Sequence, residues 1–192
     1  MAPGTRIDLT NQFLIAMPGM RDENFAGTVV YLCEHTERGA LGLVINKPID
    51  IKLKNLFEKV ELPLDREELA DQPVFFGGPV QTERGFVLHE KLGEAGGYNS
   101  TMSIPGGLEM TTSKDVLEAL ANGAGPRRVL VTLGYSGWTA GQLEDEIGRN
   151  GWLNVDADPK VIFDTPVAER YDRALSLLGF DPRMLSQEAG HA

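Results

Sequence analysis

The feature that most constrains the fold of this chain is an almost wholly apolar run, RVLVTL, at positions 128–133. A strand with one face in water alternates apolar and polar residues, so a continuous apolar run is typical of a central strand covered on both faces. The segment GYSGW at 134–138 then predicts a turn, and Thr139 with Gln142 predicts the start of a helix that ends near Ile147. We therefore expect a buried strand, a glycine-rich turn and a helix at the centre of the fold.

Helical patterns alternate with β-rich runs along the rest of the chain, which indicates an α/β or α+β domain. The apolar spacing over 53–60 predicts a short helix with Asp50 as its N-cap. A further helix is predicted over 112–123, where Gly123 ends it, and the last one begins at Pro166.

Short β-rich runs account for most of the remaining chain, and two pairs of them are expected to form antiparallel hairpins. These pairs are 28–34 with 40–46, and 74–76 with 86–89. The acidic stretch 61–72 is predicted to be a loop, as is the glycine-rich segment 93–107 around one short strand. The predicted strands are Phe13–Met17, Thr28–Glu34, Ala40–Asn46, Val74–Phe76, Phe86–His89, Thr101–Ile104, Leu108–Thr111, Trp152–Val155 and Val161–Phe163.

The chain is strongly acidic, with 28 Asp and Glu against 18 Lys and Arg and a formal net charge of −10. Such a surface repels phosphate, which makes direct nucleic-acid binding an unfavourable hypothesis. The only local basic cluster is formed by Lys47, Lys52, Lys54 and Lys59. Weak DNA binding through these lysines stays open as an alternative.

The length of 192 residues fits one domain over 1–192. The single cysteine, Cys33, cannot close an internal disulfide, and with three histidines it cannot supply a Cys/His zinc site. We expect no metal, a small core residue at Cys33 and a reducing, cytoplasmic setting. No stretch approaches the roughly 20 apolar residues of a membrane span, and the first residues do not form a signal peptide.

Two residues are candidates for enzymatic chemistry. Ser136 follows a buried strand and precedes a predicted helix, as a nucleophile elbow requires, but Trp138 stands where the elbow needs a small residue. His89 ends an apolar strand and could act as a base, although a hydrogen-bonded strand-end histidine is the commoner outcome. A hydrolase-like or transferase-like activity at these residues is one alternative, and an anion held at the same turn is another.

Several motifs, spread over essentially the whole chain, together resemble those of the YqgE/AlgH family. The resemblance implies an α+β fold in which a mixed, bifurcated β-sheet forms a pseudo-barrel flanked by helices. It also implies a bacterial protein labelled as a transcriptional regulator, with no established activity and no catalytic residues. The motifs are FLIAMPGM (13–20), ALGLVINKP (40–48), VFFGGPV (74–80), GFVLH (85–89), TTSKDVLEALANG (111–123), LGYSGWTAGQLEDEI (133–147) and GHA (190–192).

The matching positions combine turn-forming glycines with polar groups at strand ends, which is where sheets with flanking helices commonly place a binding cleft. We therefore predict a regulatory protein that binds a protein or a small ligand in a cleft near Gly77 and Ser136, without a cofactor. The predicted cleft residues are Asn46, Lys47, Gly77, Gly78, Arg84, His89, Ser113, Gly134, Ser136, Gly137 and Trp138.

Overall fold

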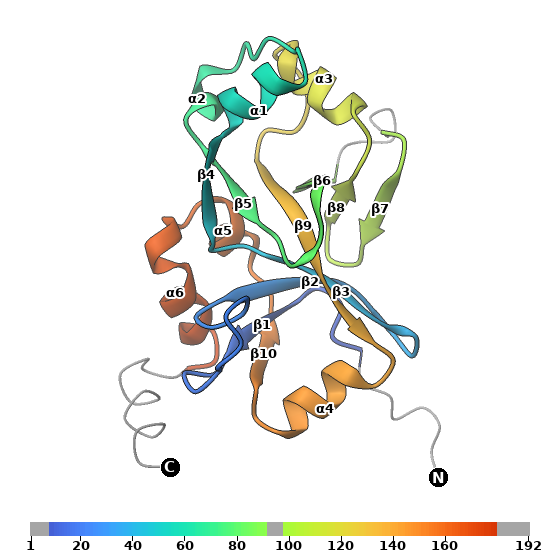
Figure 1. Ribbon diagram of the computed structural model, residues 1–192, viewed down its shortest axis with the longest axis vertical. Helices are drawn as coiled ribbons and strands as arrows, with labels where there is room; N and C mark the ends of the chain where they lie inside the picture. Colours follow the sequence, from blue (N-terminus) through green and yellow to red (C-terminus); the bar gives the residue numbers. More distant parts are fainter. Residues whose placement is uncertain (1–7, 92–97, 180–192) are drawn as a thin grey trace.

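The computed structural model describes residues 8–91 and 98–179, so part of the predicted loop (93–97) and the motif at 190–192 lie outside the described residues. Within them, ten strands form one sheet and short helices pack around it (Figure 1). The strands are β1 (Gln12–Ala16), β2 (Val29–Thr36), β3 (Gly39–Val44), β4 (Pro48–Lys52), β5 (Pro73–Phe76), β6 (Val80–Glu90), β7 (Thr101–Ile104), β8 (Leu108–Thr111), β9 (Val129–Thr139) and β10 (Trp152–Asp156). The helices are α1 (Leu53–Lys59), α2 (Glu67–Ala70), α3 (Asp115–Ala121), α4 (Gln142–Gly148), α5 (Pro159–Phe163) and α6 (Arg170–Ser176), preceded by a 3-10 turn, η2 (Val167–Glu169).

Strand β9 joins the two halves of the sheet and makes it bifurcated. Its first half pairs antiparallel with β6 and parallel with β5, for example through Thr132 opposite Phe75. Its end pairs antiparallel with β3, where Gly137 lies opposite Leu41. Figure 1 shows β9 running from the half that carries α1 and α3 to the half that carries α4.

The sheet curls around its apolar inner face, and helices cover its ends and one side. The strand order is β10-β1-β2-β3-β9-β6-β8-β7, with β5 branching from β9 and β4 pairing with β5. In Figure 1, α1, α2 and α3 lie at one end of the molecule, α4 lies at the other, and α5 and α6 lie along one side. The predicted α+β class, with a mixed, bifurcated sheet folded into a partial barrel, is confirmed.

The predicted central strand is confirmed, because the two faces of β9 contribute to different apolar clusters. Leu130 belongs to the cluster inside the curled sheet, whereas Val129 and Val131 belong to the cluster beneath α1 and α3. Cys33 is buried in the first cluster, as predicted, and its burial raises the pKa of the thiol well above the ordinary value. A third cluster lies beneath α4, around Trp138.

The turn predicted over 134–138 is wrong, since these residues continue β9 as far as Thr139 and α4 begins only at Gln142. Glycines favour turns locally, but here they allow a strand to change partners between two halves of a sheet. The hairpin predicted between 74–76 and 86–89 is also wrong. Strands β5 and β6 both pair with β9, which lies between them.

Two local assignments also differ from the prediction. The apolar run 161–163, predicted as a strand, belongs to α5, whose N-cap Asp158 accepts a hydrogen bond from the backbone N of Lys160 at 3.0 Å. So short a run fits either periodicity. The helix at 53–60 is confirmed as α1, but Asp50 is not its cap. Asp50 lies in β4, which the sequence did not predict, and the side chain of Asn55 accepts from the backbone N of Lys52 instead.

The acidic stretch 61–72 contains the one-turn helix α2. None of the helices in the described part of the chain has the length and apolarity that a membrane crossing requires.

Candidate functional site

Four of the predicted cleft residues form a tightly packed backbone junction where β9 changes partners. A Cβ atom built on Gly78 would lie 2.2 Å from the carbonyl carbon of Tyr135, and one on Gly134 would lie 2.4 Å from the carbonyl oxygen of Gly78. Ser136 is fully buried, and its hydroxyl donates to the carbonyl oxygen of Gly77 at 2.9 Å. These backbone contacts leave no space for a ligand at the junction. Its glycines and its serine instead hold the segment at 77–78 against β9.

His89 lies at the other end of the same sheet and is also fully buried. Its Nδ1 is 2.8 Å from the carbonyl oxygen of Glu90, and its Nε2 is 2.8 Å from Oγ1 of Thr111. His89 lies opposite Val129 on β9, seven residues before Ser136. At about 3.3 Å per residue this separation is roughly 20 Å. The structure therefore does not provide the serine–histidine pair that the hydrolase alternative requires.

Asn46 and Lys47 hold a neighbouring loop in place. Oδ1 of Asn46 accepts from the backbone N of Val29 at 2.9 Å, and its Nδ2 donates to the carbonyl oxygen of Gly27 at 3.0 Å. Nζ of Lys47 donates to the carbonyl oxygen of Glu23 at 3.2 Å. These interactions use the polar groups of both side chains within the protein.

The small basic cluster is partly neutralised. Nζ of Lys54 lies 3.4 Å from a carboxylate oxygen of Asp71, and Nζ of Lys52 lies 3.8 Å from the same oxygen. One carboxylate therefore offsets part of the local positive charge on which DNA binding through these lysines depends.

Trp138 belongs to a buried aromatic cluster beneath α4. Its ring stacks on Phe25 at 6.0 Å and meets Trp152 edge-on at 6.0 Å. Oε1 of Glu146 accepts from the indole nitrogens of both tryptophans at 2.9 Å, and Oε2 accepts from Nε2 of Gln142 at 2.9 Å. With 6% of its surface exposed, Trp138 acts in packing more than in contact with a ligand.

Gly137, by contrast, is exposed in an open hollow of about 440 Å³ on the outer part of β2, β3 and β9. A Cβ atom here would lie 3.4 Å from Tyr135 and 3.9 Å from Val80, which are ordinary contact distances. The fold itself does not need a glycine at this position.

Of the remaining two predicted residues, Ser113 lines a cavity of about 290 Å³ bordered by α1, α3, β6, β8 and β9, and Arg84 contacts Thr112 in the wall of this cavity. We call this cavity the α1–α3 pocket. Nη2 of Arg84 donates to Oγ1 of Thr112 at 3.3 Å, and the hydroxyl of Ser113 is bonded to Asn99 and Asp115. The pocket is lined by Leu56, Val60, Glu83, Gly85, Val87, Thr111, Thr112, Ser113, Lys114, Leu117, Val131 and Leu133.

Gly85 lines the α1–α3 pocket at a position where the fold has space for a side chain. It lies inside β6, and its nearest neighbour to a built Cβ atom is the carbonyl oxygen of Thr132 at 4.0 Å. A glycine inside a strand weakens the strand and often marks a bulge or a place where a ligand approaches closely. The register of β6 on β9 shifts between Val80 and Gly85, so Gly85 also lies at an irregularity of the strand. The sequence prediction missed Gly85, although the alternation of Glu83, Gly85 and Val87 in a strand places all three on one face.

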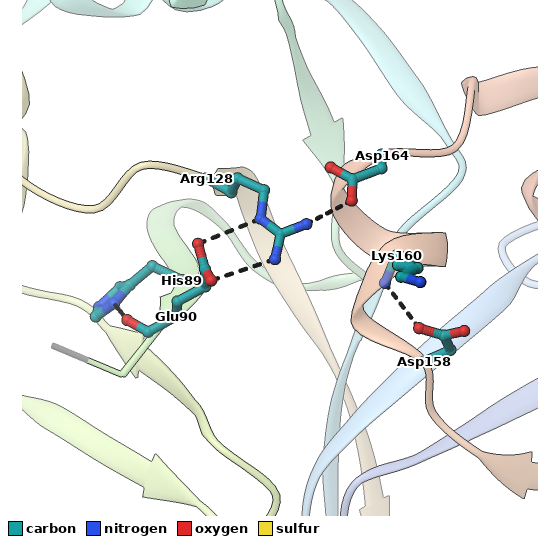
Figure 2. A network of polar contacts seen from close by, with 6 residues as sticks. All are labelled: His89, Glu90, Arg128, Asp158, Lys160 and Asp164. Atoms are coloured by element: carbon teal, nitrogen blue, oxygen red, sulfur yellow. Dashed lines mark hydrogen bonds and ion pairs between the residues drawn. The ribbon is translucent and has the colours of Figure 1, made fainter.

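A separate polar network joins β6, β9 and α5 near His89 (Figure 2). Nε and Nη2 of Arg128 each donate to a carboxylate oxygen of Glu90 at 3.2 Å, and Nη1 contacts Asp164. The hydrogen bond from Arg128 lowers the pKa of Glu90 below its ordinary value of 4.5. Because two carboxylates already neutralise Arg128, the network acts as a link between elements and does not offer a free cation.

This link predicts a pH-dependent contribution to stability. A carboxyl group with a lowered folded-state pKa stabilises the fold above its unfolded value of 4.5, and the effect is lost as the pH falls through the folded-state value. Since both side chains are more than a third exposed, we expect Arg128→Gln to cost no more than about 1 kcal/mol at about pH 7. Urea unfolding of both proteins across the acid range measures the difference. Arg38→Gln, at an exposed arginine in the turn between β2 and β3, is the control, and a cost for Arg128→Gln that stays constant with pH would contradict the assignment.

The structure also bears on metal binding. Among residues 8–91 and 98–179, no group of three His, Cys, Asp or Glu side chains is placed to hold a metal ion. The expectation of no metal and no cofactor stays a prediction.

Comparison with known proteins identifies relatives along the whole chain. A family model described as AlgH-like matches residues 13–183. A UPF0301 protein of Ralstonia nicotianae is 67% identical over 191 residues, which cover 100% of this chain and 99% of the relative. A UPF0301 protein of Burkholderia vietnamiensis is 68% identical over 190 residues, which cover 99% of this chain and 98% of the relative.

Two solved structures share the fold. The solution structure of the AlgH protein from Pseudomonas aeruginosa covers 100% of both chains at 47% identity, with a TM-score of 0.77. The crystal structure of protein DIP2367 from Corynebacterium diphtheriae covers 88% of this chain and 86% of its own at 19% identity, with a TM-score of 0.68. The second likeness concerns the fold alone.

Proposed function

We propose that this chain, which belongs to the AlgH-like family, is a cytoplasmic regulatory protein that works by binding a small ligand in the α1–α3 pocket. Any effect on transcription would then be indirect, through the ligand-bound protein. The observation that carries the proposal is Gly85, a strand glycine whose missing side chain keeps one wall of an apolar pocket open.

The surroundings of the pocket support this choice. Val87 and Val131 from the sheet, with Leu56 and Leu117 from the helices, line it on several sides. The predicted residue Ser113 lines the pocket, and Arg84 donates to Thr112 in its wall. Nε2 of His89 lies 2.8 Å from Oγ1 of Thr111, which also lines the pocket. Seven predicted residues, in contrast, serve packing or backbone contacts: Asn46, Lys47, Gly77, Gly78, Gly134, Ser136 and Trp138.

Filling the pocket from Gly85 tests the proposal. Gly85→Val adds a branched side chain whose Cβ would lie 4.0 Å from its nearest neighbour, the carbonyl oxygen of Thr132, so we expect its unfolding temperature to equal or exceed that of the wild type. A thermal-shift screen against nucleotides, metabolites and metal ions should yield compounds that stabilise the wild type and have no effect on Gly85→Val.

Gly137→Ala, which changes the open hollow instead, is the matched control and should keep the ligand response. If every stabilising compound acts equally on Gly85→Val and the wild type, the site is not the α1–α3 pocket. If the panel yields no stabilising compound, but a purified protein partner binds and Gly85→Val abolishes its binding, the pocket serves a protein and the small-ligand function is wrong.

A further inference from the structure

The rim of the α1–α3 pocket carries two opposite charges that have no partner within the described part of the protein. Glu83 projects from β6, and Lys114 precedes α3. Both are exposed, and neither belongs to an ion pair among residues 8–91 and 98–179.

The other polar groups of the pocket are already engaged. Oγ1 of Thr111 is 2.8 Å from both the His89 ring and Oγ1 of Thr101. Oγ1 of Thr112 accepts from Arg84, and the hydroxyl of Ser113 is bonded to Asn99 and Asp115. The guanidinium of Arg84 donates to Gln81 and Thr112 and lies over the ring of Phe86. Among the residues that line the pocket, Glu83 and Lys114 are therefore the charged groups available to a ligand.

The interior of the pocket is apolar. Val87, Val131 and Leu133 from the sheet face Leu117 of α3 across it, with Leu56 on the side of α1. The volume of about 290 Å³ suits a molecule with one branched or aromatic side chain.

We infer that the α1–α3 pocket binds the zwitterion of an apolar α-amino acid, an inference that rests on the proposed ligand-binding function. The ammonium group pairs with Glu83, the carboxylate pairs with Lys114, and the side chain packs on the valine and leucine surface. An apolar carboxylic acid would leave Glu83 unpaired beside the ligand, and an apolar amine would leave Lys114 unpaired. A zwitterion with an apolar side chain satisfies both charges at once.

Binding of L-leucine and of its two halves tests this inference without any mutation. Isothermal titration of the full chain is performed with L-leucine, with 4-methylpentanoate, which lacks the amino group, and with 3-methylbutylamine, which lacks the carboxylate. We expect L-leucine to bind about three- to fivefold more tightly than either half, because each half loses one ion pair with an exposed partner. L-serine, which lacks the apolar side chain, should bind more weakly than L-leucine by a similar factor.

Two variants at the rim of the pocket test which charged group of the ligand each residue binds. Glu83→Gln should remove the advantage of L-leucine over 4-methylpentanoate, and Lys114→Gln should remove its advantage over 3-methylbutylamine. L-phenylalanine and L-methionine are titrated in parallel, so that a preference for another apolar side chain is detected. Equal affinity for the amino acids and their halves, or binding unaffected by both variants, would overturn the inference.

Failure of this inference and failure of the proposed function give different results. If the thermal-shift panel yields a ligand that depends on Gly85 while no apolar amino acid binds, the pocket is a ligand site and the amino-acid assignment is wrong. If neither the panel nor the amino acids give a response that depends on Gly85, both are wrong.

Discussion

Gly78→Ala is expected to destabilise the protein by about 3 kcal/mol or more, because a methyl group at this position collides with backbone and cannot be accommodated by a side-chain rotation. The added Cβ would lie 2.2 Å from the carbonyl carbon and oxygen of Tyr135 and 2.4 Å from the backbone nitrogen of Ser136. The φ angle of +154° adds backbone strain for any residue with a side chain. Urea unfolding measures the loss, and for a chain of this size the unfolding temperature should fall by roughly 10 °C.

The control for this variant is Gly137→Ala, on β9, the strand whose backbone at Tyr135 and Ser136 lies against Gly78. Its Cβ would make only ordinary contacts, with Tyr135 at 3.4 Å and Val80 at 3.9 Å, so its stability should change by less than about 0.5 kcal/mol. Similar losses in Gly78→Ala and Gly137→Ala would show that this region of the fold tolerates no added side chain at all, and that the close approach of Gly78 to Tyr135 is not the reason.

The glycines of β9 also show which features of the fold the sequence could and could not predict. Local pattern predicted the apolar strand, most short strands and the amphipathic helices, because strand and helix periodicity are properties of neighbouring residues. The glycines at 134 and 137 gave the same local signal as a turn. Only the pairing of Ser136 with Gly42 and of Thr132 with Phe75 shows that they lie within a strand shared by two halves of a sheet.

Strand pairing was predictable only between neighbours in the chain. The hairpin of β2 and β3 was predicted correctly, since Gly39 between them allows a tight connection. The proposed pairing of β5 with β6 failed because β9, distant in sequence, lies between them. A strand that is apolar on both faces takes a central place, but its sequence does not specify which strands flank it.

The predicted binding residues were chosen from motif positions, and the structure divides them by physical role. Motif glycines such as Gly78 are explained by backbone contact, whereas Arg84 and Ser113 lead to a pocket. Glu83, Gly85 and Lys114 were absent from the prediction because a pocket wall is assembled from several segments, and no short pattern joins them.

Glu146→Ala is the second variant from which we expect a large effect, of about 3 kcal/mol. One carboxylate oxygen accepts hydrogen bonds from the indole nitrogens of Trp138 and Trp152, both at 2.9 Å. The rings are 6% and 2% exposed, so removal of the carboxylate leaves two buried donors without their acceptor. The cost of such donors is their full desolvation, and that cost exceeds the net value of the hydrogen bonds themselves.

Fluorescence gives this prediction a second measurement besides urea unfolding. The chain contains two tryptophans, and both belong to this cluster, so intrinsic tryptophan emission reports on it alone. Glu146→Ala should shift the emission of the folded protein, since both indole nitrogens lose the same partner.

The matched control is Glu146→Gln, because the amide oxygen can still accept from both indoles and only the exposed hydrogen bond from Nε2 of Gln142 is lost. It should lose less than about 1 kcal/mol, with the emission close to that of the wild type. If Glu146→Ala and Glu146→Gln were equally destabilised, the negative charge and not the acceptor would matter to the cluster. If neither were destabilised, the packing of Phe25, Trp138 and Trp152 would suffice to hold α4 against the sheet, and the carboxylate would add nothing to it.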